Sequence, residues 1–220
     1  MITKAAGAPA LLVRGWSHES WVQGYFPTDL PRDWRFSYAT NDLSALVIPA
    51  SDWSALTKEE LGYSPQLSES AVQTWINDVP DGFEIYLELE HPDIAQTLSN
   101  PGIADLTATL SENFAGFLER PNALREAMAA GGETWAVESS ICVLGDPHLQ
   151  RESLGAVWVG GTAFSTHPDL KALADFFRHL LRGPSEKRAD FIVITEPEVT
   201  PTVLPELETL VELLCDSLSP

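Results

Sequence analysis

The chain has 220 residues, 44% of them hydrophobic, and 13 Lys and Arg against 32 Asp and Glu give it a formal net charge of −19. This length can bury the core of one α/β domain, so we expect a single domain over residues 1–220. So acidic a chain repels phosphate backbones, which argues against nucleic acid as a partner. We find neither a signal peptide nor an apolar run long enough to span a membrane, so we expect a cytoplasmic protein whose partner is a small molecule or a protein.

The two cysteines do not indicate a metal site or a disulfide framework. Cys142 lies in an apolar run typical of a strand, and Cys215 lies in one typical of a helix. Neither has a Cys, His or Asp partner at metal-ligand spacing. We therefore expect two buried, reduced thiols.

The first apolar run leads into an unusually aromatic stretch. Leu11–Leu12–Val13 reads as the core of a strand, and residues 15–34 then hold three tryptophans, a tyrosine and two prolines. Aromatic side chains bury large areas, and prolines fix the path of the backbone. This composition predicts a structured connection between a strand and a helix.

Six runs along the chain have the short, apolar, β-branched or aromatic character of strands covered on both faces. They are Leu11–Trp16, Leu43–Ile48, Phe83–Leu89, Trp135–Leu144, Ala156–Val159 and Phe191–Thr195. Helical patterns lie between them, and this alternation predicts an α/β fold with a mainly parallel sheet. A TIM-type barrel, complete or incomplete, and an open doubly wound sheet both satisfy that pattern.

Three amphipathic patterns predict helices. One follows Pro168 and places Leu173, Phe177 and Leu181 on a common face, and another near the C-terminus carries Leu207, Val211 and Leu214. A third runs through the middle of the chain with Leu106, Leu110, Phe114 and Phe117 in register. The surrounding segment, 91–133, contains no convincing strand, so it predicts either two helices or a strand that the pattern conceals.

The aromatic stretch resembles the YecE-like family, a widespread domain family of unknown function that folds as TIM-type barrels. The motifs that carry the resemblance are Gly15-Trp16-Ser17, Trp21, Tyr25-Phe26-Pro27, Leu30-Pro31, Tyr38-Ala39, Trp75 and Pro80-Asp81-Gly82-Phe83. Their order and spacing match the family over about the first 90 residues. The resemblance implies a barrel scaffold for this chain.

The chain departs from that family at polar positions. Family members carry a glutamate and an asparagine where this chain has Val47 and Pro49, and a lysine on the third strand where it has Glu88. The asparagine-rich motif near the family's C-terminus has no counterpart. The resemblance therefore implies a short, diverged member that acts as a binding or regulatory protein without the family's polar site.

Polar residues that follow strands are the candidates for a functional site, because ligands bind at the carboxyl ends of parallel strands. The residues selected for catalysis are Glu138, Glu196 and His91, and those selected for binding are Trp16, His18, Glu90, Asp146 and His148. Such carboxylates and imidazoles suit a divalent metal, although no motif specifies one, and they also suit a general acid and base. An enzyme acting on a small metabolite or a phosphoester is therefore the alternative to a binding protein.

Overall fold

A computed structural model describes residues 8–53, 72–73, 79–90, 101–130, 135–142, 153–160, 170–182, 189–197 and 199–218. The strands are β1 (Ala10–Arg14), β2 (Ala45–Ile48), β3 (Glu84–Glu90), β4 (Phe114–Arg120), β5 (Trp135–Cys142), β6 (Ser153–Gly160) and β7 (Phe191–Ile194). The α-helices are α1 (Glu19–Gly24), α2 (Arg35–Thr40), α3 (Ala50–Trp53), α6 (Pro101–Leu110), α7 (Asn122–Ala130), α8 (Leu170–Leu181) and α9 (Leu204–Leu218). Two 3₁₀ helices, Arg32–Trp34 and Ser111–Asn113, precede α2 and β4. Within these residues, no helix is both long and apolar enough to cross a membrane.

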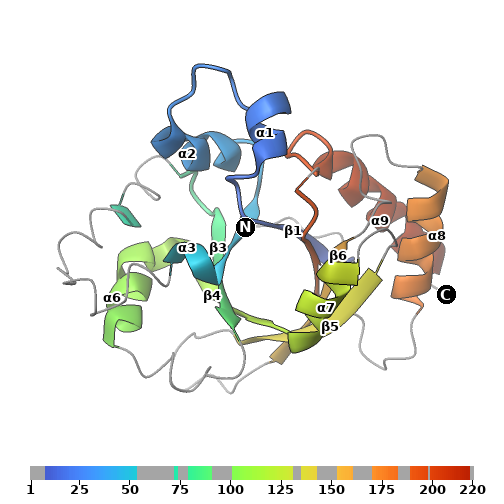
Figure 1. Ribbon diagram of the computed structural model, residues 1–220. Helices are drawn as coiled ribbons and strands as arrows, with labels where there is room; N and C mark the ends of the chain where they lie inside the picture. Colours follow the sequence, from blue (N-terminus) through green and yellow to red (C-terminus); the bar gives the residue numbers. More distant parts are fainter. Residues whose placement is uncertain are drawn as a thin grey trace.

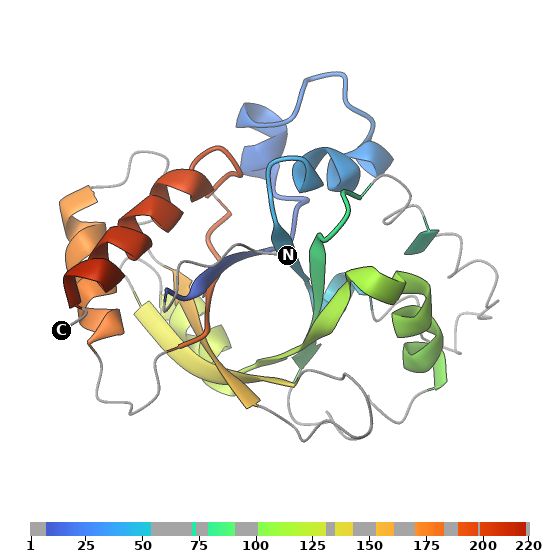
Figure 2. The same ribbon diagram turned by 180° about the vertical axis from the view of Figure 1, so that it is seen from behind.

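The strands close into a barrel in chain order, and β7 pairs with β1 to complete the ring. Six strands run in one direction, whereas β5 is antiparallel to both of its neighbours. Figure 1 shows the ring with α1, α2, α6, α8 and α9 outside it, and Figure 2 shows the same arrangement from behind. The predicted mainly parallel α/β sheet is confirmed, and its closure differs from the open doubly wound alternative.

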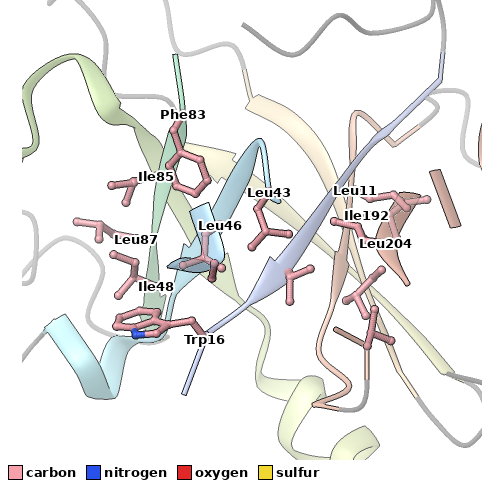
Figure 3. Packing of buried hydrophobic residues seen from close by; sticks show 14 of the residues in the cluster. Leu11, Trp16, Leu43, Leu46, Ile48, Phe83, Ile85, Leu87, Ile192 and Leu204 are labelled. Carbon is pink, nitrogen blue, oxygen red and sulfur yellow. The ribbon is translucent and has the colours of Figure 1, made fainter. Parts of the chain in front are cut away.

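Two apolar clusters hold the barrel together. The larger lies between the strands and the surrounding helices and contains Leu11, Leu46, Leu87, Ile192 and Leu204 (Figure 3). Alternate residues of the same strands, such as Leu12 and Val47, form the smaller cluster inside the barrel. Strands with both faces covered in this way read as continuous apolar runs, which is why most of them were predictable.

The helix α7 departs from the usual place of a barrel helix. It begins two residues after β4 ends, and its fully buried Leu124 belongs to the cluster inside the barrel. In Figure 1, α7 accordingly lies at the edge of the ring, next to β5 and β6. This helix therefore covers part of the carboxyl-terminal end of the barrel.

The central helix prediction was half wrong. Leu106 and Leu110 do lie in α6, but Phe114 and Phe117 belong to β4, where their rings pack with centroids 5.1 Å apart. A 3₁₀ turn carries the chain directly from α6 into β4, so the i, i+4 spacing of apolar residues continues by coincidence across the boundary. The strand concealed in segment 91–133 is β4.

Tyr86 should give the barrel interior a measurable response to alkaline pH. It is buried and donates a hydrogen bond of 2.9 Å to Glu84 Oε2; burial and then the charge of Glu84 raise the pKa of Tyr86 far above its ordinary value. The unfolded chain releases this proton near pH 10 and the folded chain retains it. The free energy of unfolding should therefore fall above pH 10, by at most about 1.4 kcal/mol per pH unit from this residue.

Urea denaturation at several pH values between about 9 and 11 tests this effect, since the reference tyrosine pKa is about 10. Tyr86→Phe should have the shallower loss of stability with pH. Burial and Asp42 also raise the pKa of Tyr25. Tyr25 therefore supplies part of the pH dependence of stability that remains in Tyr86→Phe. Equal slopes for the wild type and Tyr86→Phe would show that Tyr86 ionises alike in both states.

Candidate functional site

Three charged side chains from three strands meet at the carboxyl-terminal end of the barrel. Arg14 is the last residue of β1, Glu88 lies near the end of β3, and Arg120 is the last residue of β4. The Glu88 carboxylate accepts hydrogen bonds from Arg14 Nε at 2.5 Å and Nη2 at 3.1 Å, and from Arg120 Nη1 at 3.4 Å. We call these three residues the mouth cluster.

The mouth cluster is largely withdrawn from water. The Glu88 side chain is completely buried, and those of Arg14 and Arg120 are 18% and 19% exposed. Desolvating an ion pair costs several kcal/mol per ion, so apolar replacements are often as stable or more stable. Stability alone therefore does not account for three charges at this position, which makes the cluster a candidate for function.

Two further hydrogen bonds fix the backbone at the mouth cluster. Trp53 of α3 donates from Nε1 to the Glu88 carbonyl oxygen at 2.9 Å. His18 Nε2 lies 2.8 Å from the Arg14 carbonyl oxygen, and since a carbonyl only accepts, this nitrogen carries the proton. The backbone carbonyls of Arg14 and Glu88 thus each accept a hydrogen bond from a neighbouring turn or helix.

The turn after β1 depends on Gly15. Its φ is +78°, and a Cβ at this position would lie 3.3 Å from His18 Nε2 and 3.5 Å from Pro49 Cγ. Gly15→Ala should therefore lower the free energy of unfolding by about 1–3 kcal/mol and disturb the carbonyl of Arg14. Chemical denaturation measures the loss.

Gly24→Ala is the matched control, because Gly24 ends α1 and a Cβ there meets nothing within 4 Å. That variant should be neutral or gain up to about 1 kcal/mol. An equal effect of the two substitutions would contradict the assigned role of the Gly15 turn.

Buried apolar residues lie beside the mouth cluster on the neighbouring strands. Val47 is fully buried, and its register partners are Arg14 on one side and Tyr86 on the other. Leu118, also fully buried, is the register partner of Glu88. The charges therefore lie at the end of a filled interior.

Three of the predicted binding residues lie near this end of the barrel. Trp16 is only 9% exposed and packs edge-on against Phe36 with ring centroids 4.9 Å apart, so its indole belongs to the outer core. His18 binds the Arg14 carbonyl. Glu90, the last residue of β3, is the register partner of Arg120. The structure thus places His18 at the Arg14 carbonyl and the backbone of Glu90 beside that of Arg120.

The structure describes the backbone of two of the other candidates, Glu138 and Glu196. Glu138 is the register partner of Val157, a member of the outer cluster, and Glu196 lies just after β7 in a turn that Val199 closes. His91, Asp146 and His148 lie outside the described residues. Among the described residues, no three His, Cys, Asp or Glu side chains are placed to hold a metal ion.

The reversal of β5 also changes the reasoning behind Asp146 and His148. They were selected because they follow a strand, on the premise that its end lies with the other carboxyl ends. The last residue of β5, Cys142, pairs with Ser153, the first residue of β6. This strand therefore ends at the amino-terminal end of the barrel, away from the mouth cluster.

None of the mouth-cluster residues, Arg14, Glu88 and Arg120, was among the predicted site residues. Glu88 carried a usable signal, because a glutamate between Leu87 and Leu89 in a buried strand must find a cationic partner. Arg14 closes an apolar strand in the same way. Arg120 could not be found, because its strand had not been recognised.

Comparison of the chain with protein-family models, with curated proteins and with solved structures found no match in any of the three.

Proposed function

We propose that this chain is a diverged YecE-like protein on a TIM-type barrel scaffold, and that it acts as a binding or regulatory protein. In this proposal a small molecule binds at the carboxyl-terminal end of the barrel, beside the mouth cluster. The observation that carries the proposal is the buried Glu88 paired with arginines from two other strands. Parallel barrels present their ligand-binding groups at this end.

The geometry favours binding over proton transfer. Both oxygens of Glu88 accept hydrogen bonds from guanidinium groups, and an arginine does not release its proton at any physiological pH. Such a network holds the two guanidinium groups in fixed orientations as hydrogen-bond donors. An enzyme using other carboxylates remains the alternative, and it receives no comparable support from the described residues.

A library of small molecules screened by thermal shift tests the proposal. The informative variant is the triple substitution of Arg14, Glu88 and Arg120 by methionine, which removes all three charges in favour of apolar side chains and so should fold. Compounds that bind at the mouth should raise the Tm of the wild type and fail to raise that of the triple variant.

Arg178→Met is the matched control, because Arg178 forms an exposed ion pair with Asp175 on α8. It should respond to the same compounds as the wild type. Compounds that stabilise the wild type and the triple variant equally would place binding elsewhere and contradict the proposal.

A further inference from the structure

We propose that the ligand at the mouth carries an oxyanion, either a carboxylate or a phosphate group, and that Arg14 binds it. This inference rests on the proposed function, since it assigns the chemical class of the ligand at that site. It goes further by naming the atoms that would make the contact.

The first observation in favour of an oxyanion is the arrangement of the hydrogen-bond donors of Arg14. A guanidinium has five N–H donors in one plane. Glu88 occupies the edge formed by Nε and Nη2. Within the part of the chain that the structure describes, no second partner lies at the end of the guanidinium formed by Nη1 and Nη2: Nη1 has no hydrogen bond, Nη2 bonds only Glu88, and 18% of the side chain is exposed. Two parallel N–H groups at that end match the two oxygens of a carboxylate or a phosphate.

The second observation is that hydrogen bonds hold the Arg14 side chain in one orientation. An arginine ordinarily loses much side-chain freedom when it binds a ligand, and that loss weakens binding. Here two hydrogen bonds to Glu88 hold the guanidinium, and His18 holds the Arg14 carbonyl. The side chain is therefore ordered before any ligand arrives.

The third observation is the charge of the mouth cluster. Two guanidinium groups share the single carboxylate of Glu88, so its charge compensates only one of them. With two guanidinium groups and one carboxylate, the three members of the mouth cluster carry a net positive formal charge. The chain as a whole carries −19, but salt screens distant charges beyond about 10 Å at 0.1 M ionic strength.

Titrations with inorganic phosphate and with succinate, at constant ionic strength, test the assignment. Side-chain ¹⁵N–¹H spectra of the arginines report on the guanidinium directly, and Arg14→Gln identifies its signal by the loss of one peak. We expect the Arg14 signal to shift on titration with at least one probe, whereas that of Arg178 should not. The probe that binds more tightly identifies phosphate or carboxylate as the preferred group.

Arg14→Gln should weaken binding of that probe at least tenfold. Arg14→Lys should also lose most of the affinity, because an ammonium group cannot bond Glu88 and present a fork at the same time. Since Arg14→Gln leaves Glu88 with fewer partners and can impair folding, the same titration is repeated on the triple variant with methionine at positions 14, 88 and 120. That protein should be folded by circular dichroism and should not bind the probe.

The outcomes separate the two proposals. Binding of the probe by the folded triple variant with unchanged affinity would overturn the role of Arg14. If neither probe binds, but neutral compounds are found whose binding requires the mouth cluster, the oxyanion assignment fails and the proposed function stands. If no compound of any class depends on the cluster, the proposed function fails as well.

Discussion

Glu88→Ala should lower the free energy of unfolding by about 3–5 kcal/mol, because it leaves two largely buried arginines without the carboxylate of Glu88. A domain of ordinary stability has roughly 5–15 kcal/mol in total, so the variant should unfold at a much lower urea concentration. Removing the side chain also deprives Arg14 of two hydrogen bonds. Equilibrium denaturation in urea measures the change.

The triple substitution of Arg14, Glu88 and Arg120 by methionine is the control for this prediction. It removes all three charges together, so no buried ion is left unpaired, and its stability should be close to that of the wild type or higher. A loss as large as that of Glu88→Ala would show that the cluster stabilises the fold. A loss below about 1 kcal/mol for Glu88→Ala would show that water reaches the arginines freely.

Much of the fold was predictable because its strands are buried on both faces. Residues 11–13, 46–48 and 192–194 form unbroken apolar runs, and each of them lies within an observed strand. The two amphipathic helices near the C-terminus were also found, since Leu173 and Phe177 of α8 and Leu207 and Val211 of α9 are buried as their spacing indicated. Local sequence patterns are sufficient to predict a strand or a helix where the buried residues follow the spacing of only one of the two.

Two strands show where local patterns fail. The sequence of β4 has glycine and charged residues among its apolar ones, and its phenylalanines continue the spacing of α6, so its period is ambiguous. The direction of β5 is not a property of its own residues. It follows from pairing with Ser153–Gly160 over the whole length of the strand, which is information about two segments at once.

The mouth cluster was hard to predict for a related reason. Its members are separated by 74 and 32 positions in the sequence, and each resembles an ordinary charged residue at the end of a strand. What makes them a site is the parallel register that brings three strand ends to one edge of the barrel. The residues selected instead, such as Glu138, were judged by their place in a strand whose direction was not known.

Trp158→Ala should have the other large effect, a loss of about 3–5 kcal/mol in the free energy of unfolding. Trp158 is fully buried inside the barrel, where its register partner on β7 is Val193, which pairs in turn with Leu12. Several neighbours in the same cluster are alanines, at positions 10, 45 and 156, so one large ring fills space that small side chains leave.

The surrounding structure has little capacity to collapse into the resulting cavity, because hydrogen bonds join the strands into a closed ring. Trp158→Phe should consequently lose much less stability than Trp158→Ala. Trp34→Ala is the matched control, since Trp34 is 61% exposed and its removal should change stability by no more than about 0.5 kcal/mol. Urea denaturation of the three variants decides the question: similar stability for Trp158→Ala and Trp34→Ala would mean that the interior of the barrel repacks, and that its closed ring is less rigid than the pairing of its strands implies.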